Sequence, residues 1–181
     1  MVQAAVFTDG ALFLSAMAQG EGTEQDVDQT TGEIYAYHKY ECTLYREDLT
    51  SGQIAILEFP ALGVGKPQVN ALVKDTDGSV WALCQTAESE AADAEDVWFF
   101  VHFAEDGTYL ETIALDFSGT QIDPAQVYLN HLALDGTGRF VCADYSDTVY
   151  IFSEAGALLK TLSQDGKYGN LVSLSNQAGI L

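Results

Sequence analysis

Three asparagines lie at nearly the same distance ahead of a turn glycine. The pairs are Asn70 and Gly78, Asn130 and Gly138, and Asn170 and Gly179. The members of the first two pairs are eight residues apart, and those of the third are nine residues apart. An amide side chain at the start of a strand can hydrogen-bond the neighbouring backbone in an Asx turn, or it can face a ligand. The spacing marks these asparagines as candidate ligand-binding residues and leaves both roles open.

His131 is the fourth candidate for ligand binding, because it follows Asn130 directly. In a regular strand, successive side chains point to opposite faces, so His131 is expected on the face opposite Asn130. A hydrogen-bonded core or surface histidine is the alternative to a ligand contact. The histidines at 38, 102 and 131 are too scattered for a metal-ligand spacing, and none belongs to a Ser or Cys nucleophile motif. No catalytic residue is therefore predicted.

The elements that would position these residues repeat along the chain. Each copy has an apolar strand, a tight turn rich in Asp and Gly, and a second apolar strand, followed by two further strands. The copies cover residues 2–60, 68–117 and 128–163, and the start of another covers 169–181. The third copy is close to the length of about 40 to 50 residues that is typical of a four-stranded propeller blade.

The predicted fold is therefore all-β: a β-propeller fragment of about three four-stranded antiparallel blades plus the start of a fourth. Residues 1–181 are expected to form one propeller region of a larger chain. No long apolar stripe of helical period competes, and Pro60, Pro67 and Pro124 are expected in connections. A β-solenoid or a β-sandwich is the alternative.

The composition of the chain limits the kinds of partner that are expected. A formal net charge of -20 would repel phosphate backbones and anionic membranes, so no nucleic acid is expected as a partner. No apolar run is long enough to span a membrane. Three cysteines without a C-x-x-C pair suggest buried free thiols and no structural zinc site. We expect an extracellular or cell-surface location, with no signal peptide in the printed chain.

The repeat also resembles known propellers. Leu129 to Leu162 resembles a blade of the NHL-repeat and regucalcin/gluconolactonase propellers, and Val69 to Leu83 is similar to the sensor propellers of two-component regulators. In the regucalcin/gluconolactonase family, Asn or Asp side chains at the start of innermost strands hold a divalent metal at the mouth of the central channel. The resemblance implies Asn70, Asn130 and Asn170 as oxygen ligands for a hard cation such as Ca²⁺.

The chain departs from that family in its charged ligands. The family usually adds a Glu from a first blade and an Asp from a later one, whereas the aligned position in the first copy is Val2 and the third ligand position holds Asn. Three neutral amides bind Ca²⁺ weakly, so a competent site would need carboxylates from elsewhere.

Two acidic insertions are expected on the same face as the asparagines. They cover Gln19 to Thr31 and Ala87 to Asp96, and both connect the second and third strands of a copy. In an antiparallel meander the start of the first strand and the end of the second lie at the same edge. Their composition is typical of flexible solvated loops, and loops at one end of a rigid scaffold are where binding residues concentrate.

The sequence therefore predicts a non-catalytic module that binds a small molecule or a protein, as part of a larger secreted or surface protein. One alternative is a metal-dependent, lactonase-like hydrolase in which Ca²⁺ or Zn²⁺ polarises an ester carbonyl. Another is a sensor or solute-binding accessory domain. The ring could be completed by further blades or by another chain.

Overall fold

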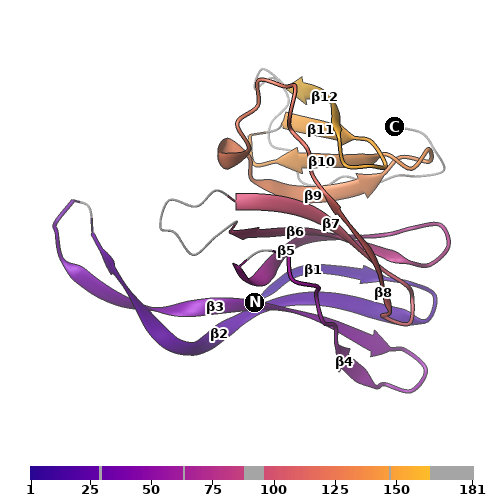
Figure 1. Cartoon of the computed structure of the whole chain (residues 1–181). Helices are drawn as coiled ribbons and strands as arrows, with labels where there is room; N and C mark the ends of the chain where they lie inside the picture. Colours follow the sequence, from indigo (N-terminus) through magenta and orange to yellow (C-terminus); the bar gives the residue numbers. More distant parts are fainter. Residues whose placement is uncertain (29, 63, 88–95, 147, 164–181) are drawn as a thin grey trace.

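Three four-stranded antiparallel sheets make up the protein (Figure 1). A computed structural model describes residues 1–28, 30–62, 64–87, 96–146 and 148–163. The first sheet contains β1 (Val2–Phe7), β2 (Ala11–Val27), β3 (Ile34–Asp48) and β4 (Ile54–Ile56). The second contains β5 (Val64–Lys74), β6 (Val80–Ala87), β7 (Asp96–Phe103) and β8 (Tyr109–Ala114). The third contains β9 (Leu129–Leu134), β10 (Phe140–Asp144), β11 (Thr148–Phe152) and β12 (Leu158–Ser163).

In each sheet the strands pair in the order in which they follow one another in the chain. β5 contacts both β1 and β9, so the first strands of the three sheets are neighbours. The only helical segment in the described ranges is the single 3-10 turn η1 (Pro124–Gln126), and no described helix is long and apolar enough to cross a membrane. This arrangement confirms the predicted all-β fold with four-stranded propeller blades. The expected start of a fourth blade, residues 169–181, lies outside the described residues.

The middle sheet is buried on both faces, as β6 shows best. Val80, Ala82 and Cys84 pack into a core shared with the first sheet, which includes Phe13 and Leu44. The side chains between them on β6, Trp81 and Leu83, pack into a second core shared with the third sheet, where the rings of Phe100 and Phe140 stack 3.9 Å apart. Alternation along a strand sends successive side chains to opposite faces. The uninterrupted apolar run of β6 therefore fits a strand between two neighbours.

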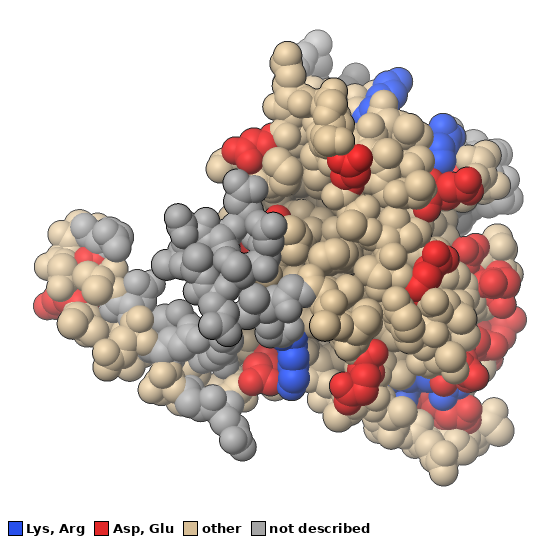
Figure 2. All heavy atoms as spheres, in the orientation of Figure 1, with Lys and Arg blue, Asp and Glu red and all other residues tan. Residues whose placement is uncertain are grey.

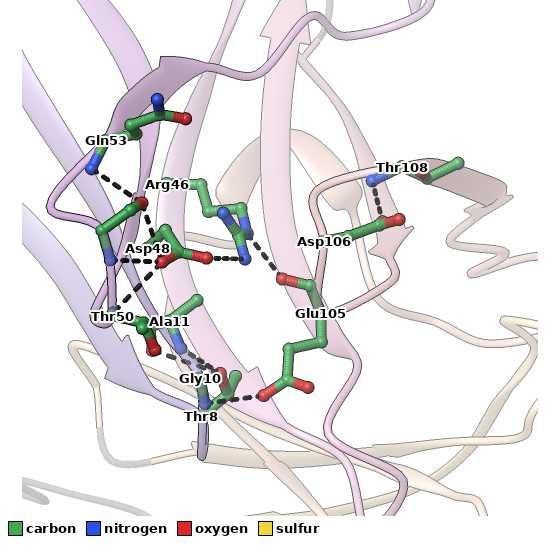
Figure 3. Close-up of polar contacts among 11 residues, drawn as sticks. Thr8, Gly10, Ala11, Arg46, Asp48, Thr50, Gln53, Glu105, Asp106 and Thr108 are labelled. Atoms are coloured by element: carbon green, nitrogen blue, oxygen red, sulfur yellow. Dashed lines mark hydrogen bonds and ion pairs between the residues drawn. The ribbon is translucent and has the colours of Figure 1, made fainter.

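A polar contact joins the first two sheets at the end that carries the β1–β2 turn (Figure 3). The backbone N–H of Gly10 donates to Glu105 Oε1 at 2.9 Å, and Arg46 Nε donates to the Glu105 carbonyl oxygen at 2.6 Å. Hydrogen bonds from Thr8 and from the Gly10 backbone lower the pKa of the Glu105 carboxyl. Glu105, from the turn between β7 and β8, therefore fixes the position of the second sheet against the first.

The second and third sheets meet closely at Gly156, in the turn between β11 and β12. Gly156 is buried and has φ of 83°, a conformation that glycine adopts readily and other residues rarely. Its carbonyl oxygen accepts the Asp116 N–H at 2.9 Å, and the Leu158 N–H donates to the Asp116 carbonyl oxygen at 2.9 Å. A Cβ at this position would overlap the Ala114 carbonyl oxygen. Only glycine allows this approach.

Asp135 stabilises the turn between β9 and β10. Its carboxylate accepts hydrogen bonds from the backbone N–H groups of Thr137 and Arg139, and from the side chains of both residues. Burial alone would raise the pKa of Asp135, but these hydrogen bonds lower it to about 2. The folded state therefore favours the ionised carboxylate.

The prediction of a solvated loop over Gln19 to Thr31 is wrong for most of its length. β2 continues to Val27 and pairs with β3 through Gln19↔Tyr40, Thr23↔His38 and Val27↔Ile34. Tyr, Thr, Val and Ile favour strands, and most of them lie on β3, opposite the polar residues of β2 that suggested a loop. Asp28 Oδ1 accepts the backbone N–H groups of Thr30 and Thr31, which closes the turn.

The placement of Pro67 in a connection is also wrong. Pro67 lies inside β5, between the paired residues Val64 and Gln68, where the register with β6 shifts. A proline cannot donate to a ladder hydrogen bond, and an irregular position tolerates this loss. Pro60 precedes β5 in a connection, and Pro124 opens η1.

Candidate functional site

The first strand of every sheet has an extra residue at nearly the same place. In β1, Val2 and Ala4 pair with consecutive residues of β2, which leaves Gln3 between them. In β5 the extra residue is Asn70, and in β9 it is Asn130. Such β-bulges reorient a side chain and recur next to functional sites. All three bulged residues carry amides.

The spacing pattern in the sequence did not reveal Gln3, because the turn between β1 and β2 is shorter than the corresponding turns of the other two sheets. Four residues separate the paired ends of β1 and β2, whereas five separate β5 from β6 and β9 from β10. The amide in the first sheet therefore precedes Gly10 by seven residues and not by eight. Val2, the aligned position in sequence, is one residue out of register, and Gln3 is the structural counterpart of Asn70 and Asn130.

Asn70 links the second and third sheets. Its Nδ2 donates to the Leu129 carbonyl oxygen at 3.0 Å and to Gln85 Oε1 at 3.3 Å. Gln85 Nε2 in turn donates to Asp96 Oδ2 at 2.6 Å. The Asn70 Oδ1 atom is buried and has no hydrogen-bond partner among the described residues. Few buried acceptors in native proteins lack a partner, so this oxygen needs an explanation.

Asn130 and His131 contact each other directly. Asn130 Oδ1 lies 2.6 Å from His131 Nδ1. The expectation of opposite faces assumed a regular strand and does not hold, because Leu129 and His131 pair with consecutive residues of β10 and Asn130 is bulged out between them. Asn170, the last asparagine of the predicted set, lies outside the described residues.

A polar cavity of about 320 Å³ lies beside Gln85 and Asp96. Its other lining residues are Met17, Tyr40, Cys42, Lys66, Gln68, Thr86 and Ala87. Lys66 Nζ forms an ion pair with Glu41 Oε2 at 2.8 Å, which raises the pKa of the lysine. Volumes of this order are typical of small-molecule sites. We call the bulged amides Gln3, Asn70 and Asn130, with Gln85, Asp96 and this cavity, the polar end.

The β2–β3 hairpin leaves the first sheet at the end where β1 starts. Val2 pairs with Ala16, and β2 continues from there to Val27. We call the two-stranded part, residues 19–27 and 34–40, the arm. Figure 1 shows the arm extending well beyond the three sheets. The second acidic insertion, apart from its first and last residues, lies outside the described residues, so its position stays a prediction.

The three thiols are buried, and the acidic side chains of the described residues form no metal-binding cluster. Cys42, Cys84 and Cys142 are buried free thiols, and burial raises the pKa values of Cys84 and Cys142. Within the described part of the chain, no group of three or more His, Cys, Asp or Glu side chains could hold a metal. Figure 2 shows Asp and Glu side chains spread over the displayed face, with few Lys and Arg among them.

In the comparison with known proteins, the similarity to U3-55K supports the fold. No family model and no curated protein matches the chain. The structure of U3-55K is similar with a TM-score of 0.53 and 15% identity, covering 96% of this chain and 42% of that one. The extracellular domain of the putative hybrid two component system BT4673 from B. thetaiotaomicron has a TM-score of 0.45 and 13% identity, covering 95% of this chain and 23% of that one. A glucose dehydrogenase has a TM-score of 0.40 and 10% identity, covering 78% of this chain and 48% of that one.

These similarities concern the fold alone. The chain spans less than half the length of each of these proteins. The β-propeller architecture is shown, whereas the specific resemblance to NHL-repeat and regucalcin/gluconolactonase propellers stays a prediction. Propellers host unrelated functions, so function must be argued from the polar end.

Proposed function

We propose that this protein is a non-catalytic binding module of a larger secreted or surface protein, and that the polar end binds a small polar ligand. The observation that carries the proposal is the buried Asn70 Oδ1, which has no partner in the described part of the chain. This oxygen is the open acceptor of a chain of hydrogen bonds that runs from Leu129 through Asn70 and Gln85 to Asp96. A ligand in the cavity would meet this chain at Gln85 and Asp96, which line the cavity, and a turn of the Asn70 side chain toward the ligand would satisfy Oδ1.

The cavity lining supports a polar ligand. Gln68 and Gln85 offer amide donors and acceptors, Asp96 offers a carboxylate, and Tyr40 offers an aromatic ring with a hydroxyl. Because Lys66 is already paired with Glu41, the described lining residues include no unpaired cation to attract an anion. A neutral or zwitterionic compound with several hydroxyl or amino groups, such as a sugar or a free amino acid, fits these groups best.

Ligand-observed NMR tests the proposal with a panel of monosaccharides, disaccharides and free amino acids. We expect at least one class to bind the wild type and to lose binding in Gln85→Leu, which removes the amide between Asn70 and Asp96. The matched control is Gln53→Leu, an exposed glutamine in the turn between β3 and β4. Binding by no member of the panel, or equal binding by Gln85→Leu, would contradict the proposal.

A metal-dependent hydrolase is the second candidate, favoured by the same unpartnered Asn70 Oδ1. The remaining donors fit a divalent cation poorly. Asn130 Oδ1 is held against His131, and the described residues offer no cluster of carboxylates. Ca²⁺ sites rely on carboxylate oxygens, so no step of a reaction is derived through a metal.

Calorimetric titration with CaCl₂ separates the two candidates. Heat in the wild type that disappears in Asn130→Ala would favour the cation site. The non-catalytic module predicts no such heat, together with small-molecule binding that does not depend on added calcium.

A further inference from the structure

Among the described strands, only β2 and β3 make up the arm, and no third described strand pairs with it. β1 pairs with β2 as far as Ala16, with backbone hydrogen bonds between Met1 and Met17 just beyond it, and β4 pairs with β3 only over Tyr45–Glu47. The arm thus has the backbone hydrogen bonds of a hairpin but little sheet on either side. Isolated two-stranded hairpins are marginally stable in water. A partner that packs on the arm would add the stabilisation that the fold itself does not supply.

Over residues 23–27 and 34–38, one face of the arm carries no Asp, Glu, Lys or Arg and is exposed. The paired residues on this face are Thr23 with His38, Gln25 with Ala36, and Val27 with Ile34. Val27 and Ile34 are 43% and 69% exposed, and Tyr40, two residues beyond His38 on β3, is 64% exposed. Val27 and Ile34 are paired near the tip of the arm, and Tyr40 lies at its base opposite Gln19. Exposed apolar side chains and tyrosines are enriched at protein interfaces, where tyrosines often supply much of the binding energy.

The negative charge around this face indicates which kind of partner the arm would bind. Residues 19–40 contain five Asp or Glu and a single Lys, in a chain whose formal net charge is -20. This charge repels nucleic acids and anionic membranes, and it attracts a basic protein surface. We propose that the arm docks into an apolar groove of another protein, and that Lys and Arg side chains line the rim of this groove.

The test selects a displayed random peptide library on the wild-type protein. We expect the enriched peptides to combine apolar or aromatic residues with a net positive charge. The variant Val27→Thr plus Ile34→Thr keeps β-branched side chains and removes the apolar pair. It should weaken binding of an enriched peptide about tenfold, the loss expected when one or two interface anchors are truncated.

The matched control is Ile54→Thr plus Ile56→Thr in β4, where the side chains are 67% and 60% exposed. This control should leave binding unchanged, and both variants should unfold at the wild-type urea midpoint. Glu33→Lys in the turn of the arm should weaken binding and reduce its dependence on salt.

Three results would overturn the proposal. The library could yield no binder, the binders could lack positive charge, or they could bind the arm variant as tightly as the wild type. Sedimentation could give a fourth contradicting result, a wild-type dimer that the arm variant converts to a monomer. The partner of the arm would then be a second copy of this chain. The cavity variant Gln85→Leu should keep peptide binding, so that failure of the cavity ligand and failure of the arm partner are distinguishable.

Discussion

Replacing Gly156 by alanine tests the packing of the second sheet against the third. Gly156 combines φ of 83° with contact to the backbone of residue 114, whereas Gly52 has φ of 69° and nothing within 4 Å of the position of a Cβ. Both substitutions place an alanine in the left-handed region, which costs about 1–2 kcal/mol. Gly52→Ala should lose this amount and no more.

Gly156→Ala should lose more, because the new methyl group meets fixed atoms. Its Cβ would overlap the Ala114 carbonyl oxygen and lie 2.7 Å from Ile113 Cγ2, so the turn must move away from the second sheet. That movement breaks the hydrogen bonds between Asp116 and the β11–β12 turn, at about 1 kcal/mol each. The expected loss is therefore about 3–4 kcal/mol, a large share of the roughly 5–15 kcal/mol that stabilises a typical domain.

Urea unfolding followed by tryptophan fluorescence measures the difference. Trp81 and Trp98 both lie in the core shared by the second and third sheets, so the signal reports on the contact in question. Equal free energies of unfolding for Gly156→Ala and Gly52→Ala would refute the packing of these two sheets.

Three further predictions concern single side chains. Asp135→Asn should destabilise the protein at neutral pH. The ionised form is stabilised in the fold, so this difference should be fully present above the ordinary pKa of 3.8 and lost as pH falls toward about 2, measured by urea unfolding at each pH. The thiols of Cys42, Cys84 and Cys142 should not react with a thiol reagent in the native protein and should all react in urea, because all three are buried. Asn70→Asp should lower the free energy of unfolding by about 2 kcal/mol at neutral pH, since it turns a donor to a carbonyl oxygen into an acceptor, and thermal melts should show partial recovery in acid.

The turns and the order of strands could be predicted because they depend on neighbouring residues. Gly78, Gly107, Gly138 and Gly156 all have positive φ, as turns between paired strands require. The apolar run from Val80 to Cys84 is typical of a strand buried on both faces, as the structure has it. Local chemistry was sufficient for these features.

The bulges could not be predicted, since they depend on the register between two strands. Asn70 and Asn130 were recognised by their distance from a glycine, whereas Gln3 precedes a turn that is one residue shorter. The contact between Asn130 and His131 follows from the same irregularity. Aligning the three copies at the start of each turn, and not at its glycine, places Gln3 in line with Asn70 and Asn130.

The arm shows where composition misleads. Its acidic and small polar residues suggested a solvated loop, yet the strand-forming residues opposite them, from Ile34 to Tyr40, pair across the hairpin. Pairing across a hairpin is a property of two segments, and the composition of one of them does not reveal it.

The most direct test of the proposed binding end is the NMR signal of the Gln85 side-chain amide during titration with a compound selected from the panel. We predict that the NH₂ resonances of Gln85 and Asn70 shift together and saturate at the same ligand concentration, while those of Gln53 stay in place. A shift at Gln53 without one at Gln85, or no shift at any of the three, would contradict binding at the polar end.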